Sequence, residues 1–126
     1  MSSGAFDASA VLVHMHRERG REVVSTVLPD AVISAVNASE VFARLMEMGS
    51  PEQVRQDFAV LRLEVVPFDM QQAIDTAELR APTKAAGLSL GDRACLGLAR
   101  SLGLPAFTAD RNWAHADLGV EVRLIR

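Results

Sequence analysis

The sequence has 126 residues, of which 49% are hydrophobic and 23% are charged, and its formal net charge is −3. This composition excludes an intrinsically disordered chain, and the acidic balance excludes binding to nucleic acid through overall charge, because that affinity comes from neutralised phosphates. The apolar runs are too short for a membrane-spanning helix, and the single cysteine, Cys95, excludes an internal disulfide and a cysteine-based zinc site. We expect a cytoplasmic protein that folds as one domain over residues 1–126.

Apolar segments that are typical of strands alternate with helical patterns along the chain. The first strand ends at Asp7, and the second covers 31–34. A helix then begins after Ser34, a candidate N-cap, and ends at Gly49. The later elements are a helix from Pro51, a strand at 63–68, a helix after Asp69, a helix from Ser89 to Gly103, and strands at 105–109 and 120–125. This order predicts an α/β fold, a three-layer sandwich around a mostly parallel sheet of about five strands.

Some details of these elements can also be predicted. The last strand alternates apolar and charged residues, which is typical of a half-exposed edge strand. Residues 82–88 are expected to run extended, because they must bring the chain back along the sheet before the next helix. The helix after Ser34 is expected to bury one apolar stripe, which consists of Ala35, Ala38, Phe42 and Leu45.

Four acidic residues are predicted to reach one side of this sheet, the carboxyl edge, at which all parallel strands end and ligands of open α/β folds bind. Asp7 and Asp110 end the first and fourth strands. Glu40 lies in the second turn of the helix that leaves the second strand. Asp92 lies in the first turn of a helix that must run antiparallel to the fourth strand, because only a very short link connects them. Asp117 precedes a strand and therefore belongs to the opposite edge.

Each of these acids also has a purely structural explanation. Asp92 can form a capping box with Ser89, and Glu40 can form an ion pair with Arg44, one helical turn later. The two acids at strand ends can cap a helix or start a turn. Asp69 lies at the same edge, but a capping role accounts for it.

Four carboxylates at one edge would raise one another's pKa, and a divalent cation would compensate their charge. Mg²⁺ and Mn²⁺ prefer oxygen ligands and retain bound waters, so an all-carboxylate site fits them better than zinc. The three histidines are not expected to be ligands, because His14 and His16 point to divergent faces of a helix and His115 lies in a polar loop.

The segments that carry the four acids resemble those of a known family. These segments are "FDASAV" with Asp7, "SAVNASEV" with Glu40, "GLSLGDRACLGLA" with Asp92 and "FTADRNWA" with Asp110. In this order, and over nearly the whole chain, they resemble the PIN-domain nucleases, in particular the VapC toxins of bacterial toxin–antitoxin pairs. The resemblance implies one PIN-like domain over residues 1–126, ribonuclease activity that depends on Mg²⁺ or Mn²⁺, a small antitoxin as partner, and a homodimer.

The resemblance also implies a catalytic set of Asp7, Glu40, Asp92 and Asp110. We expect Asp7 and Asp92 to hold the metal, Asp110 to hold it or to orient the site, and Glu40 to position the water that attacks an RNA phosphodiester. Thr108 is expected to be a hydroxyl neighbour of these acids.

Five further positions bear on this assignment. Gly4 departs from the branched apolar residues usual in the family's first strand, and Asn112 replaces an acid of many members, so we predict one metal ion rather than two. Arg93 and Arg111 each adjoin an acid of the set and could contact RNA phosphate or form surface ion pairs. Trp113 could stack on an unpaired base or pack over the edge of the sheet.

Two other functions were compared with nuclease activity. A phosphoryl-transfer domain is disfavoured, because "FDAS" lacks a second aspartate two residues after the first, and no strand is followed by an adjacent acidic pair with a later lysine. A non-catalytic, protein-binding module is left open. In that case the acidic rim would only accept a basic segment of a partner.

Overall fold

The sheet has five parallel strands in the order β3-β2-β1-β4-β5. The computed structural model describes residues 2–115 and 118–126, so Asp117 and the side chain of His115 lie outside the described part. The predicted α/β fold with a parallel, five-stranded sheet is confirmed, whereas the single domain over 1–126 stays a prediction. The strands are β1 (Gly4–Phe6), β2 (Ala31–Ser34), β3 (Glu64–Val66), β4 (Ala106–Thr108) and β5 (Val122–Leu124).

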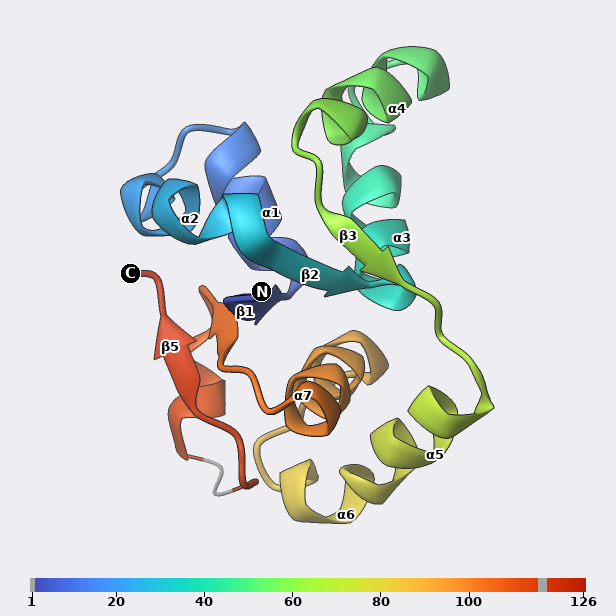
Figure 1. Cartoon of the computed structure of the whole chain (residues 1–126), viewed down its shortest axis with the longest axis vertical. Helices are drawn as coiled ribbons and strands as arrows, with labels where there is room; N and C mark the ends of the chain where they lie inside the picture. The colour runs from blue at the N-terminus through green and yellow to red at the C-terminus, as the bar shows by residue number, and fades with distance from the viewer. Residues whose placement is uncertain (1, 116–117) are drawn as a thin grey trace.

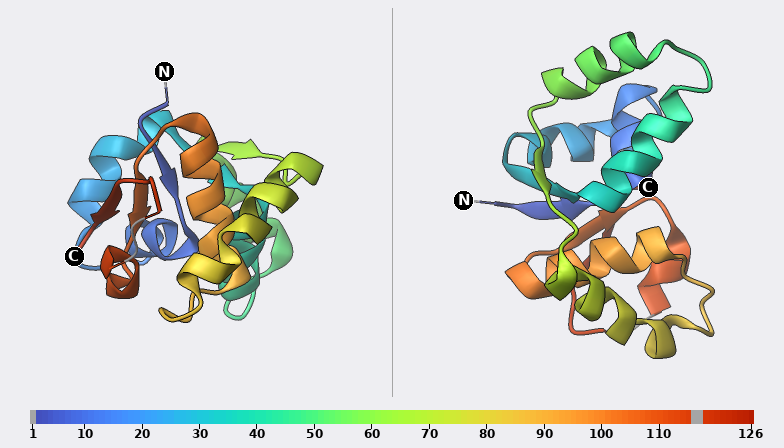
Figure 2. Two further views of the ribbon diagram at one scale, coloured as in Figure 1. Left: turned by 90° about the horizontal axis from the view of Figure 1, so that it is seen from below. Right: turned by 90° about the vertical axis from the view of Figure 1, so that its right-hand side faces the viewer.

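Helices cover both faces of the sheet, as Figures 1 and 2 show. One side carries α1 (Ala8–Met15), α2 (Arg21–Val27), α3 (Ala35–Leu45) and α4 (Pro51–Val60), and the other carries α5 (Met70–Glu78), α6 (Arg80–Thr83) and α7 (Leu90–Leu102). Two short 3₁₀ helices, η1 (Leu28–Asp30) and η2 (Arg111–His115), complete the chain. The sequence patterns do not predict α2, α6 or the 3₁₀ helices. Within the described ranges, no helix has the length and apolar character needed to cross a bilayer.

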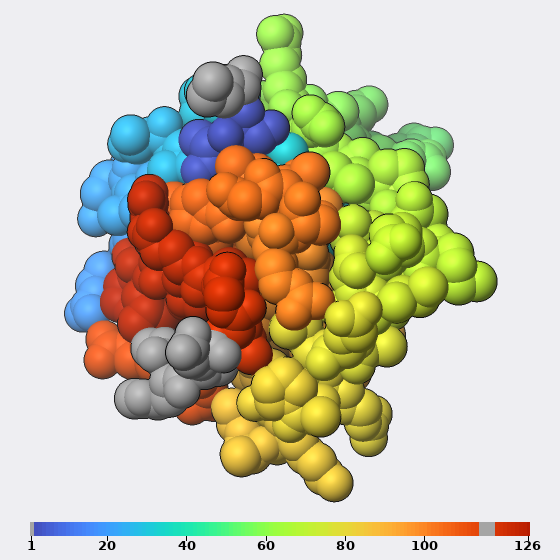
Figure 3. Space-filling view, turned by 60° about the horizontal axis from the view of Figure 1, so that its bottom comes forward, coloured from blue at the N-terminus to red at the C-terminus, as the bar shows by residue number. Residues whose placement is uncertain are grey.

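Successive side chains of the central strand, β1, point to opposite faces of the sheet, and each face has its own hydrophobic core. Ala5 faces one layer, where it packs with Cys95 and Leu96 of α7, and Phe6 faces the other, where it packs with Val11 of α1. In Figure 3, the orange segment that includes α7 lies between the red C-terminal segment and the yellow-green segment of α5. Because both faces are covered, the three central strands are buried, while β3 and β5 form the partly exposed edges.

Gly4 allows β1 to lie close to β4. A Cβ atom at this position would overlap the ring of Phe107, which is itself buried. Phe107 also makes an edge-to-face contact with Phe6, with ring centroids 5.6 Å apart, so it has little room to move. The absence of a side chain at Gly4 therefore serves the packing of the central strand.

The return segment is not extended, which corrects the sequence-based expectation for residues 82–88. Helix α6 ends at Thr83, and turns follow, with the amides of Ala86 and Leu88 donating to the Thr83 carbonyl at 3.2 and 3.5 Å. The Thr83 hydroxyl donates to the Leu79 carbonyl at 2.7 Å. Local hydrogen bonds thus give this segment a compact path.

The buried face of α3 is wider than the predicted apolar stripe. Ala38 and Val41 are buried, Phe42 and Leu45 are only partly buried, and Asn37 is completely buried. The reason is that α3 packs against helices from both layers, α1 and α7. One polar side chain of α3 therefore lies in the interior, next to the carboxyl edge.

We predict that Gly4→Val lowers the free energy of unfolding by about 1–3 kcal/mol, because the new side chain overlaps a buried ring. Denaturant unfolding of the variant, of Phe107→Leu and of the double variant measures the effect. The double variant should be more stable than the sum of the single losses predicts, since the smaller leucine frees space. Additive losses would contradict this explanation.

Candidate active site

Asp7 lies at the point where β1 ends and α1 begins, and only 5% of it is exposed. Its Oδ1 accepts hydrogen bonds from the Ser9 hydroxyl at 2.7 Å and from the Ala10 amide at 2.9 Å. Its Oδ2 accepts one from the Thr108 hydroxyl at 2.6 Å. The predicted helix cap is therefore confirmed, but capping occupies only one of the two carboxylate oxygens.

The environment of Asp7 opposes its ionisation. Burial raises its pKa from 3.8 to about 6, and the negative charge of Asp92 acts in the same direction. The hydrogen bonds from Thr108, Ser9 and Ala10 lower the pKa but only partly offset the loss of water. A carboxylate in this position is costly for the fold unless a positive charge compensates it.

Thr108 and Ser9 join the ends of β1 and β4. Besides donating to Asp7, the buried Thr108 hydroxyl accepts from the Asp110 amide at 3.0 Å, and the Ser9 hydroxyl accepts from the Ala109 amide at 2.9 Å. The predicted proximity of Thr108 to the acids is observed. Ser9 was not singled out from the sequence, although it belongs to the quoted "FDASAV" segment.

Asp110 starts the turn that leads into η2, as one of its structural explanations predicts. Its Oδ1 accepts from the Asn112 amide at 2.9 Å, and its carbonyl accepts from the Trp113 amide at 3.4 Å. Its amide is bound to the same Thr108 hydroxyl that contacts Asp7, so the two strand-end acids share one neighbour.

Asp92 forms the predicted capping box at the start of α7. The Ser89 amide donates to its Oδ2 at 2.9 Å, and the Asp92 amide donates to the Ser89 hydroxyl at 3.2 Å. Among the described residues, Oδ1 of Asp92 accepts no hydrogen bond. The cap accounts for one oxygen of this carboxylate and leaves the other available.

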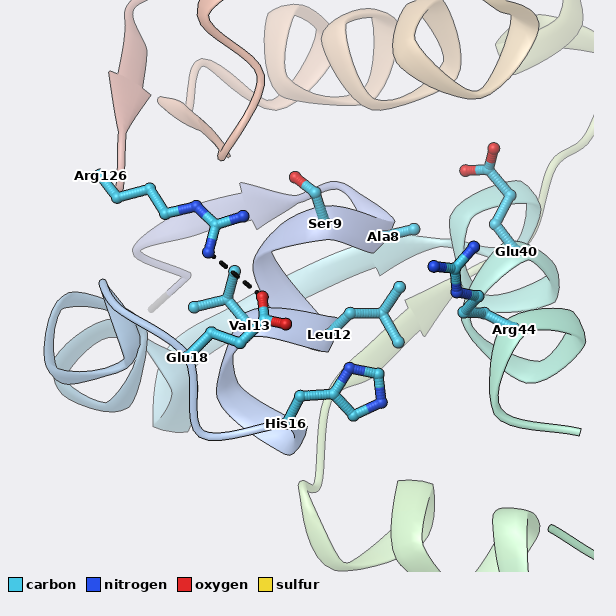
Figure 4. A pocket seen from close by; sticks show the side chains of 9 residues that line it. All are labelled: Ala8, Ser9, Leu12, Val13, His16, Glu18, Glu40, Arg44 and Arg126. Atoms are coloured by element: carbon cyan, nitrogen blue, oxygen red, sulfur yellow. Dashed lines mark hydrogen bonds and ion pairs between the residues drawn. The ribbon is translucent and has the colours of Figure 1, made fainter. Parts of the chain in front are cut away.

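Glu40 contacts α7 and makes no ion pair with Arg44 in the part of the chain that the structure describes. Its Oε1 accepts from Nδ2 of Asn37 at 2.9 Å, and the same nitrogen donates to the Gly91 carbonyl at 2.9 Å. A Cβ at Gly91 would overlap the Glu40 carboxylate, and in Figure 4 the side chain extends toward α7. Asn37 and Gly91 therefore fix the position of Glu40.

Sequence reasoning missed Asn37 and Gly91, and only Asn37 left a signal in the sequence. It is a polar residue next to Ala38 on the helical face that packs inward, three residues before Glu40. Two acceptors, the Glu40 carboxylate and the Gly91 carbonyl, determine which end of the buried amide is the nitrogen.

Three of the four acids lie near one buried thiol. Burial raises the pKa of Cys95, and the charges of Asp7, Asp92 and Glu40 raise it further. Asp110 is connected to this group through Thr108. Over residues 2–115 and 118–126, no three His, Cys, Asp or Glu side chains are already arranged as a metal-binding group. The acids thus share one region of the carboxyl edge without forming a closed cage.

A groove of about 440 Å³ leads away from this region (Figure 4). Its walls combine apolar and charged side chains from α1, from the turn that follows α1, from α3 and from the C-terminal segment. They are Ala8, Ser9, Leu12, Val13, His16, Glu18, Glu40, Arg44 and Arg126. Glu40 therefore lies at a surface that a ligand can reach.

Two residues expected near a nucleic acid have other roles. Arg93 is only 9% exposed, and its Nη1 donates to the Thr76 carbonyl at 3.4 Å, so it packs between α7 and α5 and is not placed to contact phosphate. Trp113 is fully buried in the core under α7. The packing alternative for this side chain is correct, and base stacking is not. Arg111 is exposed.

The family model of the PIN domain matches residues 5–118. The chain belongs to the PIN-domain family. A comparison of this PIN domain with curated proteins gives no significant match.

Solved structures share the fold of this PIN domain. It is similar to DNA-bound VapBC from Salmonella typhimurium, with 22% identity, a TM-score of 0.78 and full coverage of both chains. A toxin–antitoxin complex from Klebsiella pneumoniae has 18% identity and a TM-score of 0.78 over 98% of each chain. VapC20 from Mycobacterium tuberculosis, described as a sarcin–ricin loop cleaving toxin, has 14% identity and a TM-score of 0.71 over 94% of this chain and 99% of that one.

We predict a measurable coupling free energy between Asn37 and Glu40. Asn37→Ala and Glu40→Ala each remove one partner of the same hydrogen bond, so the double variant should be more stable than additivity predicts by about 0.5–1.5 kcal/mol. Denaturant unfolding of the four proteins in the cycle gives this value. As a matched control, Asn37→Ala and Arg44→Ala should combine additively, and equal coupling in both cycles would contradict the assigned contact.

We predict that Asp7 makes the metal-free protein less stable as the pH rises from about 4 to about 6. In this range the folded state retains a proton that the unfolded state has released, so raising the pH favours unfolding. The shift from 3.8 to about 6 corresponds to on the order of 3 kcal/mol. Unfolding in EDTA at several pH values measures the difference between wild type and Asp7→Asn.

Asp7→Asn should remove this part of the pH dependence, and Asp69→Asn, which changes an exposed helix cap, should retain it. Identical pH profiles for wild type and Asp7→Asn would contradict the prediction.

Proposed function

We propose that this PIN domain is a metal-dependent endoribonuclease that hydrolyses phosphodiester bonds of RNA, and that it is the toxin of a toxin–antitoxin pair. The observation that carries the proposal is the buried Asp7 carboxylate, which Ser9 and Thr108 hold where two strands end, close to Asp92. A buried acid with a raised pKa and a like-charged neighbour is more typical of a functional site than of a stabilising contact. Family membership and the likeness to VapC20 support RNA as substrate.

The donor set fits Mg²⁺ or Mn²⁺. Asp7, Asp92 and Asp110 offer only carboxylate oxygens, and one oxygen of Asp92 has no hydrogen bond from the described residues. Mg²⁺ is commonly bound through one or two carboxylates together with waters and substrate phosphates, so a closed cage of acids is not needed. A cation would also compensate the charge that raises the pKa of Asp7. With Asn112 in place of a further acid, we propose one ion.

Each side chain of the site has a separate role in the proposed hydrolysis. A bound divalent cation would acidify the attacking water and offset negative charge on the phosphate. Thr108 and Ser9 fix the orientation of Asp7, so that this carboxylate is presented in one geometry. Asp110 holds the ion or orients the groups around it. Glu40, which Asn37 holds against α7, positions the water.

The proposed partners follow from the same family assignment. The similar structure from Klebsiella pneumoniae is a toxin–antitoxin complex, which supports a small antitoxin as the partner of this PIN domain. We extend the proposal to a homodimer and to a cytoplasmic location, both as expected from the sequence.

We predict that the purified protein cleaves RNA in Mg²⁺ or Mn²⁺ and loses this activity in EDTA. Asp7→Asn should lower the cleavage rate by at least about 100-fold, because it removes a charged ligand from the site. The asparagine can still accept from Ser9 and Ala10 through its oxygen, and its nitrogen can donate to Thr108, so the variant should fold. Cleavage of labelled total RNA, with circular dichroism as a folding check, measures both effects.

The matched control is Asp69→Asn, which removes a carboxylate that caps α5. This variant should cleave RNA at nearly the wild-type rate. If cleavage is insensitive to EDTA and to Asp7→Asn, the nuclease proposal is wrong, and a non-catalytic acidic rim that binds a basic protein segment becomes the better explanation.

A further inference from the structure

A second hollow, which we call the basic hollow, lies next to the acidic site. Its volume is about 410 Å³, and its lining consists of Arg19, Ala109, Arg111 and Arg126. All three arginines are exposed, and within residues 2–115 and 118–126 no Asp or Glu side chain is part of the lining. Of the sixteen acidic residues in the chain, only Glu18 pairs with one of these arginines in the described part, with Arg126 at 3.2 Å.

The fold brings these arginines together from three distant parts of the chain. Arg19 lies in the turn between α1 and α2, Arg111 begins η2, and Arg126 follows β5. A Cβ at Gly20 would lie 3.4 Å from the Cβ of Arg126, and Figure 1 shows the C-terminal end beside α2. The Ile125 amide donates to the Thr108 carbonyl at 3.0 Å, which brings the same segment to the end of β4.

The basic hollow adjoins the acidic site through shared and neighbouring residues. Ala109 lies in its lining and stands between Thr108 and Asp110 in the chain. Arg126 lines the basic hollow and also lines the groove that contains Glu40, where Figure 4 labels its side chain. An extended ligand that passes the acids would therefore meet the arginines directly.

We propose that Arg19, Arg111 and Arg126 bind phosphate groups of the RNA strand on one side of the bond that is cut. This inference rests on the proposed nuclease function. Like charges in one hollow repel each other, and an anion from outside relieves that repulsion. A planar guanidinium group can donate two parallel hydrogen bonds to the oxygens of one phosphate. An RNA strand extends beyond the bond that is cut, so its neighbouring phosphates also lie close to the acidic centre. Cationic side chains at these positions would bind those phosphates. Of these residues, only Arg111 was predicted from the sequence.

The test measures binding separately from cleavage. A short fluorescein-labelled single-stranded RNA of mixed sequence is titrated with the Asp7→Asn protein in EDTA, at several KCl concentrations, and its anisotropy is recorded. Arg19→Gln and Arg111→Gln are then added together. Arg126 is retained, because it also pairs with Glu18 and its substitution would change a second contact.

Loss of two phosphate contacts should weaken binding about 25-fold near 0.1 M salt and reduce the salt dependence of log affinity by about 1.4. The matched control carries Arg55→Gln and Arg62→Gln, which change the net charge equally. Arg55 lies on α4, and Arg62 lines a hollow with Asp30 at the opposite edge of the sheet. The control should retain both the affinity and the salt dependence.

Equal RNA affinity of the two double variants would overturn the proposal, and so would the absence of RNA binding by the starting protein. A third measurement uses poly-glutamate. If the Arg19 and Arg111 substitutions abolish binding of poly-glutamate and leave RNA binding unchanged, the hollow receives an acidic protein segment instead, and the proposal is wrong. If the arginines do not bind RNA, the wild type can still cleave RNA. If the wild type does not cleave RNA, the dependence of RNA binding on the arginines can still be measured. The two proposals are therefore tested independently.

Discussion

The structure of the candidate site depends on one carboxylate, Asp7, that is buried at the end of the central strand. Asp7 is placed by β1, which has a strand on either side and a helical layer on each face, so the group cannot move toward water without disturbing the sheet. Its oxygens are instead satisfied by Ser9, Ala10 and Thr108. These contacts join the first strand to a segment about one hundred positions later in the chain, and they compensate burial only in part.

Opposite charges are sorted around this position. The acids are held close to α7, where Glu40 and Asp92 are each fixed by a specific hydrogen bond, and the arginines of the basic hollow lie on the side of β5. A mildly acidic chain, with a net charge of −3, thereby presents a local basic surface beside the acids. The proposed activity requires a negatively charged centre to bind a polyanionic RNA. The neighbouring arginines would offset the repulsion between the two.

The rule that parallel strands end at one edge was enough to predict where the acids go. The rule places Asp7 and Asp110 because each follows the end of a strand. Asp92 is placed by the very short link between α7 and β4. Strand ends and short links can be recognised from local sequence and connectivity. The structural explanations for these residues were also correct. Asp7 and Asp92 act as helix caps, Asp110 starts a turn, and each keeps its place at the edge while doing so. The sequence alone could not decide between capping and ligand binding, since the two are compatible.

Contacts between distant residues were the part that could not be predicted. The depth of Asn37 depends on α3 touching two layers at once, and the burial of Arg93 depends on where α5 packs on α7. The hollow formed by Arg19 and Arg126 depends on the close approach of the chain's last residues to Gly20. Apart from the position of Asn37 on the inward face of its helix, these contacts leave no periodic or spacing signal in the sequence, because each results from packing between elements far apart in the chain.

The capping box at α7 has a consequence for ligand capture. Free carboxylate side chains sample several rotamers, and ordering them when a ligand arrives costs entropy. In Asp92, the hydrogen bond from the Ser89 amide to Oδ2 already holds the side chain, while the Asp92 amide donates to the Ser89 hydroxyl, so folding itself has reduced that freedom. In the proposed metal site, the start of α7 would therefore provide a preorganised oxygen, and we expect the strength of ligand binding there to depend on the integrity of the first turn of α7.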